Sequence, residues 1–160
     1  ETVDELYRES REIMFRLMQD RLEPMPGLLE LLESLEGADI PKGIATSSRR
    51  QFAHTALDKF DLRERFSFVL TCEDIEHGKP APDVYHKAAQ QHDVDAAEMM
   101  ILEDSQIGSK TGVASGAYTV AVPAGRSHMH DFDGVQFMAN TLKDIRIYHA
   151  LRISNSSESG

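Results

Sequence analysis

Two adjacent carboxylates stand at the end of an apolar run in the segment 99–108, which reads M-M-I-L-E-D-S-Q-I-G. Four apolar residues lead into Glu103 and Asp104, and this pattern predicts a buried parallel strand followed by a helix that begins near Ile107. Ligands bind at the carboxyl ends of strands in open α/β sheets, and paired carboxylates there suit Mg²⁺ when a substrate phosphate completes its coordination. The alternative is that Asp104 or Ser105 only caps the helix. An acidic pair at the end of a buried strand is costly without a positive partner, so we interpret this turn as the candidate reactive centre.

Three hydroxyl residues, Thr46, Ser47 and Ser48, follow a second apolar run over 40–45 and precede a predicted helix over 51–60. Hydroxyls and free backbone amides between a strand and a helix form a natural anion site. On this stretch alone, it is equally open that Ser47 or Ser48 is only the N-cap of the helix.

A lysine stands in the loop that opens a further predicted helix, over 83–91. Lys79 lies between Gly78 and Pro80 in the string G-K-P-A-P-D, so the loop restricts its backbone and directs its side chain. In a chain with an anion site, this lysine is a candidate for the cation that the anion needs. The alternative is that Lys79 is an ordinary solvated charge. Arg49 is likewise either a cation for the phosphate or a solvated charge at the start of a helix.

Composition restricts the class of protein. The chain has 160 residues, enough for one domain with a substantial core. Its formal net charge of -10 argues against binding to nucleic acid or to an anionic membrane through a broad basic face. No apolar run approaches the roughly 18–20 residues of a membrane span. The single cysteine, Cys72, can form no internal disulfide, which fits a reducing cytoplasm, and we expect it to be packed rather than nucleophilic.

Strands alternate with helices from Gly27 onward, and this order predicts an α/β fold with a parallel, doubly wound sheet. An amphipathic helix over 1–21 comes first, and Pro24-Met25-Pro26-Gly27 breaks its pattern. The Ser-rich residues 151–160 predict a disordered tail. The expected strands cover 40–45, 66–71, 99–102, 118–122 and 135–138, and the later helices cover 28–36, 51–60, 83–91, 107–115 and 142–150.

Three motifs in order, T-S-S at 46–48, G-K-P-A-P-D at 78–83 and L-E-D-S-Q-I-G at 102–108, resemble the haloacid dehalogenase superfamily. Within it, the chain is most similar to sugar-phosphate phosphatases and β-phosphoglucomutase-like enzymes with a helical cap. The resemblance implies a three-layer, Rossmann-like core over 23–150 and the remnant of a cap over 1–22. It also implies Mg²⁺-dependent phosphoryl transfer.

The resemblance assigns roles to the residues of the two candidate centres. It implies that Thr46 hydrogen-bonds the transferring phosphoryl group and that Lys79 neutralises the nucleophile and the phosphate oxygens. Asp104 would ligate Mg²⁺. Glu103 would either be a further ligand or contact a ligand without touching the metal itself. Phosphoryl transfer needs such a convergence because negative charge spreads over the equatorial oxygens.

Three neighbouring residues receive weaker roles from the resemblance. Ser47 would offer its backbone amide to the phosphate. Ser48 and Arg49 fall where related mutases hold the second phosphate of the substrate.

The family's first motif, a strand ending in D-x-D-G-T or D-x-D-G-V, supplies the nucleophilic Asp and is expected before the cap, and the 160 residues from Glu1 onward do not include it at that place. The string D-F-D-G-V at 131–135 matches in letters, but the polar residues before it form no buried strand, so we interpret it as a coincidence. We therefore expect a fragment without the central strand between those that end at Thr46 and Glu103. Exposed or collapsed strand edges would make the chain marginally folded, dimeric or aggregation-prone.

The expected function is that of a Mg²⁺-dependent phosphatase of small phosphorylated metabolites, such as sugar or nucleotide monophosphates, through an aspartyl-phosphate on an Asp missing from this chain. A sugar phosphomutase of the β-phosphoglucomutase type is one alternative, and a non-catalytic phosphate-binding fragment is another. Dehalogenation uses no metal and would leave the acidic pair without a role. We expect no nucleic-acid or membrane partner and a cytoplasmic location.

Overall fold

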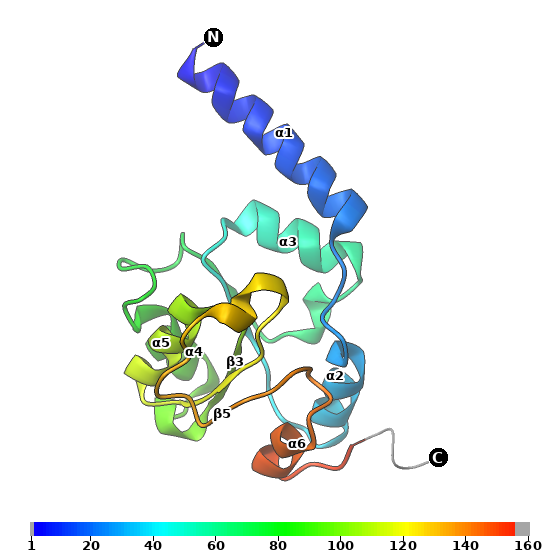
Figure 1. The fold of residues 1–160 in the computed structure, drawn as a ribbon, viewed down its shortest axis with the longest axis vertical. Helices are drawn as coiled ribbons and strands as arrows, with labels where there is room; N and C mark the ends of the chain where they lie inside the picture. Colours follow the sequence, from blue (N-terminus) through cyan, green and yellow to red (C-terminus); the bar gives the residue numbers. More distant parts are fainter. Residues whose placement is uncertain (1, 156–160) are drawn as a thin grey trace.

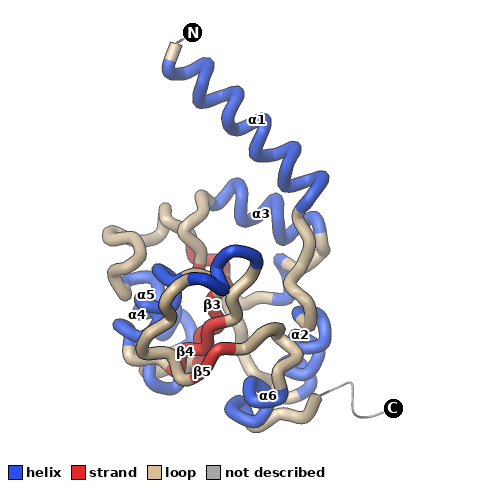
Figure 2. Tube along the Cα trace, in the orientation of Figure 1, coloured by secondary structure: helices blue, strands red, loops and turns tan. Residues whose placement is uncertain are grey.

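Short parallel strands lie between helices in the computed structural model, which describes residues 2–155 apart from the side chains of residues 6, 7 and 126 (Figures 1 and 2). All strand pairs are parallel, and the α/β class predicted from the sequence is confirmed. The strands are β1 (Ile44–Ala45), β2 (Val69–Leu70), β3 (Met100–Glu103), β4 (Tyr118–Ala121) and β5 (Phe137–Met138). The α-helices are α1 (Val3–Arg21), α2 (Leu28–Gly37), α3 (Arg50–Lys59), α4 (Asp83–His92), α5 (Gln106–Ser115) and α6 (Ile145–Leu151), with 3-10 turns η1 (Arg63–Arg65), η2 (Ala96–Glu98) and η3 (Gly125–Met129).

The strands form two separate sheets. β1 pairs with β2, whereas the second sheet has the order β3-β4-β5. In the second sheet Met100 lies opposite Tyr118, and Glu103 lies opposite Ala121. Among residues 2–155, β1 and β3 therefore each have a strand partner on one edge only.

The first sheet is shorter than the sequence predicts. The apolar runs 40–45 and 66–71 predicted longer strands, but pairing is limited to residues 44–45 and 69–70. Backbone hydrogen bonds reach slightly further, from the Ser67 amide to the Lys42 carbonyl at 2.8 Å and from the Thr46 amide to the Leu70 carbonyl at 2.9 Å, but Pro41 has no N–H to continue them toward residue 40. Because β2 ends at Leu70, Cys72 lies in the following loop and is exposed, and the expectation that it is packed is wrong.

Two apolar clusters hold helices against the strands. The first joins α2, α6 and β4 through side chains such as Leu31, Ile147 and Val120. The second joins α4 to β2 and β3, and Tyr85 and Ile101 belong to it. Burial of apolar surface stabilises a fold by about 25 cal/mol per Å², so these clusters hold the layers together. Figure 1 shows α4 and α5 on one side of the strands and α2 and α6 on the other.

The predicted N-terminal helix forms α1, which extends away from the rest of the chain (Figure 1). It begins with a capping box between Thr2 and Glu5, and the ring of Phe15 packs against that of Phe52 on α3, with centroids 5.0 Å apart and planes tilted by 35°. The Lys59 ammonium donates to the carbonyls at the end of the helix, those of Met18, Gln19 and Leu22, at 2.6–3.1 Å.

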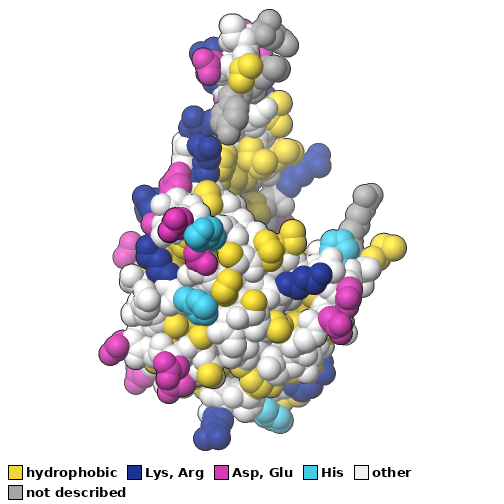
Figure 3. Space-filling model, turned by 90° about the vertical axis from the view of Figure 1, so that its left-hand side faces the viewer, with side chains coloured by type: hydrophobic (Ala, Val, Ile, Leu, Met, Phe, Trp, Pro, Cys, Tyr) yellow, Lys and Arg dark blue, Asp and Glu magenta, His cyan; other side chains and the backbone are white. Residues whose placement is uncertain are grey.

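Much of the apolar face of α1 is exposed. Val3 is 78% exposed, Ile13 57%, Met14 50% and Leu17 45%. Figure 3 shows apolar side chains along the part of α1 nearest the rest of the molecule. The charged positions between them account for the low overall apolarity of this helix, and no helix among residues 2–155 is long and apolar enough to cross a membrane.

The structure describes the expected C-terminal tail only as far as Asn155. Leu151 is the last residue of α6, and Ile153 packs against the first apolar cluster. The remainder of the expected tail, residues 156–160, lies outside the described residues.

Candidate active site

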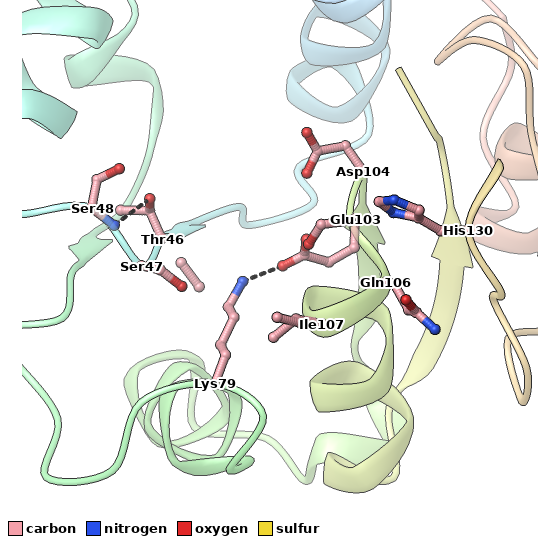
Figure 4. Close-up of a pocket in the computed structure, with 11 residues that line it drawn as sticks. Thr46, Ser47, Ser48, Lys79, Glu103, Asp104, Gln106, Ile107 and His130 are labelled. Carbon is pink, nitrogen blue, oxygen red and sulfur yellow. Dashed lines mark hydrogen bonds and ion pairs between the residues drawn. The ribbon is translucent and has the colours of Figure 1, made fainter. Parts of the chain in front are cut away.

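The carboxyl ends of β1 and β3 border a cavity of about 580 Å³ (Figure 4). Its walls come from three separate parts of the chain: the loop after β1, the loop before α4 and the turn from β3 to α5. The site residues predicted from the sequence meet here, with the exception of Arg49, which is not among the lining residues. The lining residues are Ala45, Thr46, Ser47, Ser48, Lys79, Glu103, Asp104, Ser105, Gln106, Ile107 and His130.

The loop after β1 presents polar groups to one side of the cavity. The Ser48 backbone amide donates to Thr46 Oγ1 at 3.1 Å, so the threonine hydroxyl is held at the end of the strand. The N-cap of α3 is Arg49, and it makes no capping bond with its side chain. Ser47 and Ser48 therefore do not cap the helix, and the alternative that they serve only as caps is excluded.

Lys79 is the positive partner of the acidic turn. Its side chain is 8% exposed and that of Glu103 is 9% exposed, and Lys79 Nζ forms an ion pair with Glu103 Oε1. The hydroxyl of Tyr85, on α4, donates to the same oxygen. A buried carboxylate is costly unless it is paired and hydrogen-bonded, and these two donors meet that requirement.

Gly108 makes room for the Glu103 carboxylate. A Cβ atom at position 108 would lie 2.0 Å from Glu103 Oε2, so a side chain there would collide with the carboxylate. Ser105 is the N-cap of α5, and its Oγ accepts from the Gly108 amide at 3.0 Å. Of the two residues considered as caps, Ser105 is the cap and Asp104 is left exposed at the cavity.

The two acidic residues at the cavity, Glu103 and Asp104, decide whether the site fits Mg²⁺. Mg²⁺ is often bound by one or two carboxylates together with water and substrate phosphate. Asp104 is exposed at the cavity and fits the role of such a carboxylate. Glu103 Oε1 is already occupied by Lys79 and Tyr85, so the geometry favours Glu103 as the partner of Lys79. Within residues 2–155 no group of three or more His, Cys, Asp or Glu side chains could hold a metal ion.

Five lining residues were not among the predicted site residues: Ala45, Ser105, Gln106, Ile107 and His130. Gln106 and Ile107 open α5, and Ile107 is 57% exposed although it is apolar. Their position next to the acidic pair was a signal that could have found them. His130 arrives from the loop after η3, and no local pattern in the sequence indicates that this loop returns to the cavity.

The string D-F-D-G-V at 131–135 lies in the loop between η3 and β5, directly after the lining residue His130, and none of its own residues is among the lining residues. Phe132 is buried, and the Asp133 amide donates to Asp131 Oδ1 at 3.1 Å within the turn. Gly134 adopts φ +84°. These contacts show what the string does locally in the turn.

Comparison with known proteins relates the chain to phosphatases. Residues 1–122 match the family described as haloacid dehalogenase-like hydrolase. The bifunctional riboflavin kinase/FMN phosphatase of Arabidopsis thaliana is 29% identical over 135 residues, which cover 84% of this chain and 36% of that protein. The fructose-1-phosphate phosphatase YqaB of Escherichia coli (strain K12) is 31% identical over 117 residues, which cover 73% of this chain and 61% of that protein.

A solved structure shares the fold. The β-phosphoglucomutase of Clostridium difficile superposes with a TM-score of 0.69 at 16% sequence identity, over 88% of this chain and 60% of that one. The chain thus spans between about one third and three fifths of the length of these relatives.

Proposed function

Because this chain belongs to the haloacid dehalogenase-like hydrolases, we propose that it forms the phosphate-binding part of a phosphoric monoester hydrolase. Its substrate is a small phosphorylated metabolite, such as a sugar or nucleotide monophosphate. The observation that carries this proposal is the convergence of Thr46, Lys79 and Asp104 on one cavity from three separate segments. The phosphatase relatives named above add support.

Each lining group has a task in holding a phosphoryl group. The Lys79 ammonium faces the space between the 46–48 loop and Glu103 (Figure 4), where it would neutralise a phosphate oxygen. The Thr46 hydroxyl and the Ser47 amide supply hydrogen-bond donors from the opposite side. Donors fixed in advance around developing charge are the main means by which proteins accelerate phosphoryl transfer.

Mg²⁺ fits this site with Asp104 as a ligand, and when bound it would neutralise charge on the phosphate oxygens. This role as a metal ligand also explains why Asp104 is exposed. Its side chain is exposed and is among those that line the cavity. Glu103, in contrast, acts through Lys79.

The nucleophile in this scheme is an aspartate on a further strand between β1 and β3, outside the residues described. The aspartate oxygen bonds to phosphorus as the ester P–O bond breaks, and the leaving oxygen takes a proton from a neighbouring acid. Water then attacks the phosphorus of the aspartyl-phosphate and releases inorganic phosphate. The single-sided pairing of β1 and β3 supports this placement, because both strands have an edge available for hydrogen bonds.

The same proposal divides the chain by role. Residues 1–22, which contain the projecting α1, belong to a cap over the site, and residues 23–150 form the core that carries the cavity. A reducing cytoplasm is the proposed location, since the only cysteine has no disulfide partner in the chain.

A sugar phosphomutase is the second candidate. Its support is the fold shared with β-phosphoglucomutase and the presence of Ser48 at the cavity. A mutase must also hold a second phosphate, and Arg49, the residue expected to do so, does not line the cavity. Hydrolysis is therefore the better-supported reaction.

The test uses the protein expressed from its complete open reading frame, with a panel of sugar and nucleotide monophosphates. We expect release of inorganic phosphate with Mg²⁺ and its loss with a chelator. Asp104→Asn should lower the rate about 100-fold or more, because the site loses a charged ligand. The chain of 160 residues, assayed in parallel, should bind phosphate without turnover. No release from any compound would contradict hydrolysis, and transfer within a sugar phosphate would favour the mutase.

A further inference from the structure

We propose that Tyr85 is a positioning residue for Lys79: with Glu103, its hydroxyl holds the lysine ammonium so that one N–H is directed at the phosphate cavity. The consequence for catalysis rests on the proposed function. The positioning itself is a property of this chain and can be tested without any substrate.

The polar groups of Lys79, Glu103 and Tyr85 form a triangle beside the cavity, in which each group contacts the other two. Lys79 Nζ contacts Glu103 Oε1, Tyr85 Oη donates to the same oxygen, and Lys79 Nζ lies 3.2 Å from Tyr85 Oη. The ammonium also lies 5.2 Å from the centre of the Tyr85 ring. Tyr85 is 5% exposed and belongs to the second apolar cluster, so its ring is held by packing that does not depend on the hydroxyl.

A count of donors shows what the hydroxyl adds. A lysine ammonium has three N–H donors, and the triangle uses one toward Glu103 and one toward Tyr85. A single N–H remains for the cavity. Without the tyrosine oxygen, a second N–H would lose its partner and the ammonium could turn about its one remaining contact.

The same hydroxyl restrains Glu103. It fills a second acceptor position on Oε1, while Gly108 provides the close surface against which Oε2 lies. Burial, and next the Glu103 carboxylate, raise the pKa of Tyr85 well above its usual range. The phenol therefore keeps its proton and remains a donor to the carboxylate. Both partners of Lys79 are thus fixed before a phosphate arrives.

Tyr85→Phe removes the hydroxyl and leaves the ring, and Tyr148→Phe is a matched control. Tyr148 is fully buried in the first apolar cluster, and its hydroxyl has no hydrogen-bond partner among residues 2–155. Each variant is made in the 160-residue chain and in the protein from the complete open reading frame. The melting temperature of each variant reports whether it folds.

The first measurement is the labelling rate of Lys79 by an amine-reactive acylating reagent, followed by mass spectrometry of the peptide. We expect Tyr85→Phe to raise this rate about tenfold, a change in the range of one lost hydrogen bond to a charged group. Tyr148→Phe should leave it unchanged. Equal rates in the two variants would overturn the positioning. If Tyr85→Phe does not fold, Glu103→Gln, which weakens the same acceptor, should raise the labelling instead, and an unchanged rate there would also overturn it.

The second measurement is steady-state kinetics with the best phosphate ester found for the complete protein. We expect kcat to fall about tenfold in Tyr85→Phe with KM changed less than about threefold, because positioning matters most in the transition state. Faster labelling with unchanged kcat would overturn the role in catalysis. If no ester is hydrolysed by the unmodified protein, the proposed function fails, whereas the labelling result still decides the role of Tyr85.

Discussion

The carboxylate of Glu103 lies directly against the α-carbon of Gly108 in the first turn of α5, where a Cβ atom would approach Oε2 to 2.0 Å. The end of β3 and the start of α5 can meet this closely only because residue 108 has no side chain. The contact sets where Glu103 stands, and Glu103 in turn sets where Lys79 stands.

Gly108→Ala should therefore destabilise the fold by about 1–3 kcal/mol, the usual cost of forcing an extra group into a filled space. Alanine has a higher helix propensity than glycine, so the free energy of unfolding would be expected to rise if no collision occurred. Urea unfolding measures the free energy. Gly37→Ala is the control, since nothing lies within 4 Å of a Cβ atom there. Equal stability of the two variants would show that the carboxylate moves aside without cost.

Lys79→Met should lower the free energy of unfolding by about 3–5 kcal/mol, because it leaves the Glu103 carboxylate buried without its cation. The matched control is Lys143→Met, which breaks the ion pair with Glu30, where the side chains are 58% and 39% exposed. Removal of such an exposed pair costs about 1 kcal/mol or less. Chemical denaturation of both variants checks the difference. Adding Glu103→Gln to Lys79→Met should recover part of the loss.

The stability of the protein should fall as the solution is acidified from about pH 4.5 to about pH 2. A hydrogen bond from Arg65, and next one from Lys42, lower the pKa of Glu36 to about 2. Because the pKa is lower in the folded state, the stabilisation is complete above the unfolded value of about 4.3 and is lost as the pH falls toward 2. Glu36 is 40% exposed, so solvent screening limits the effect to about 1 kcal/mol.

Glu36→Gln tests this dependence. Thermal melts over the acidic range should lose part of their pH dependence in this variant, and Arg65→Met should have a similar effect, since Arg65 Nε lies 2.8 Å from Glu36 Oε1. A melting temperature that changes with pH identically in all three proteins would contradict the assignment to this pair.

The 160-residue chain should associate in solution. β1 and β3 each have one unpaired edge among the described residues, and α1 exposes an apolar face. Unpaired edges and apolar faces invite pairing with other chains. Sedimentation and thermal melting over a tenfold range of protein concentration should show a rise in mass or in melting temperature. A monomer with a sharp melting transition that is independent of concentration would contradict this prediction.

The order of elements could be predicted from local patterns. Apolar runs between turn residues indicated each strand, and helical spacing indicated each helix, so α4 and α5 were expected within a residue or two of their observed bounds. The ends of β1 and β2 could not be predicted, because a strand extends only as far as its neighbour in space pairs with it.

The sequence by itself determined which chemistry the site could perform, because residue types and their order specify the available hydroxyl, ammonium and carboxylate groups. Only the tertiary structure decided which of these groups contact one another and which are exposed to the cavity. It placed Glu103 with Lys79 and Tyr85, left Asp104 exposed, excluded Arg49 from the cavity and brought in His130. Such choices depend on distances between segments far apart in the chain, and these distances are set when the layers pack.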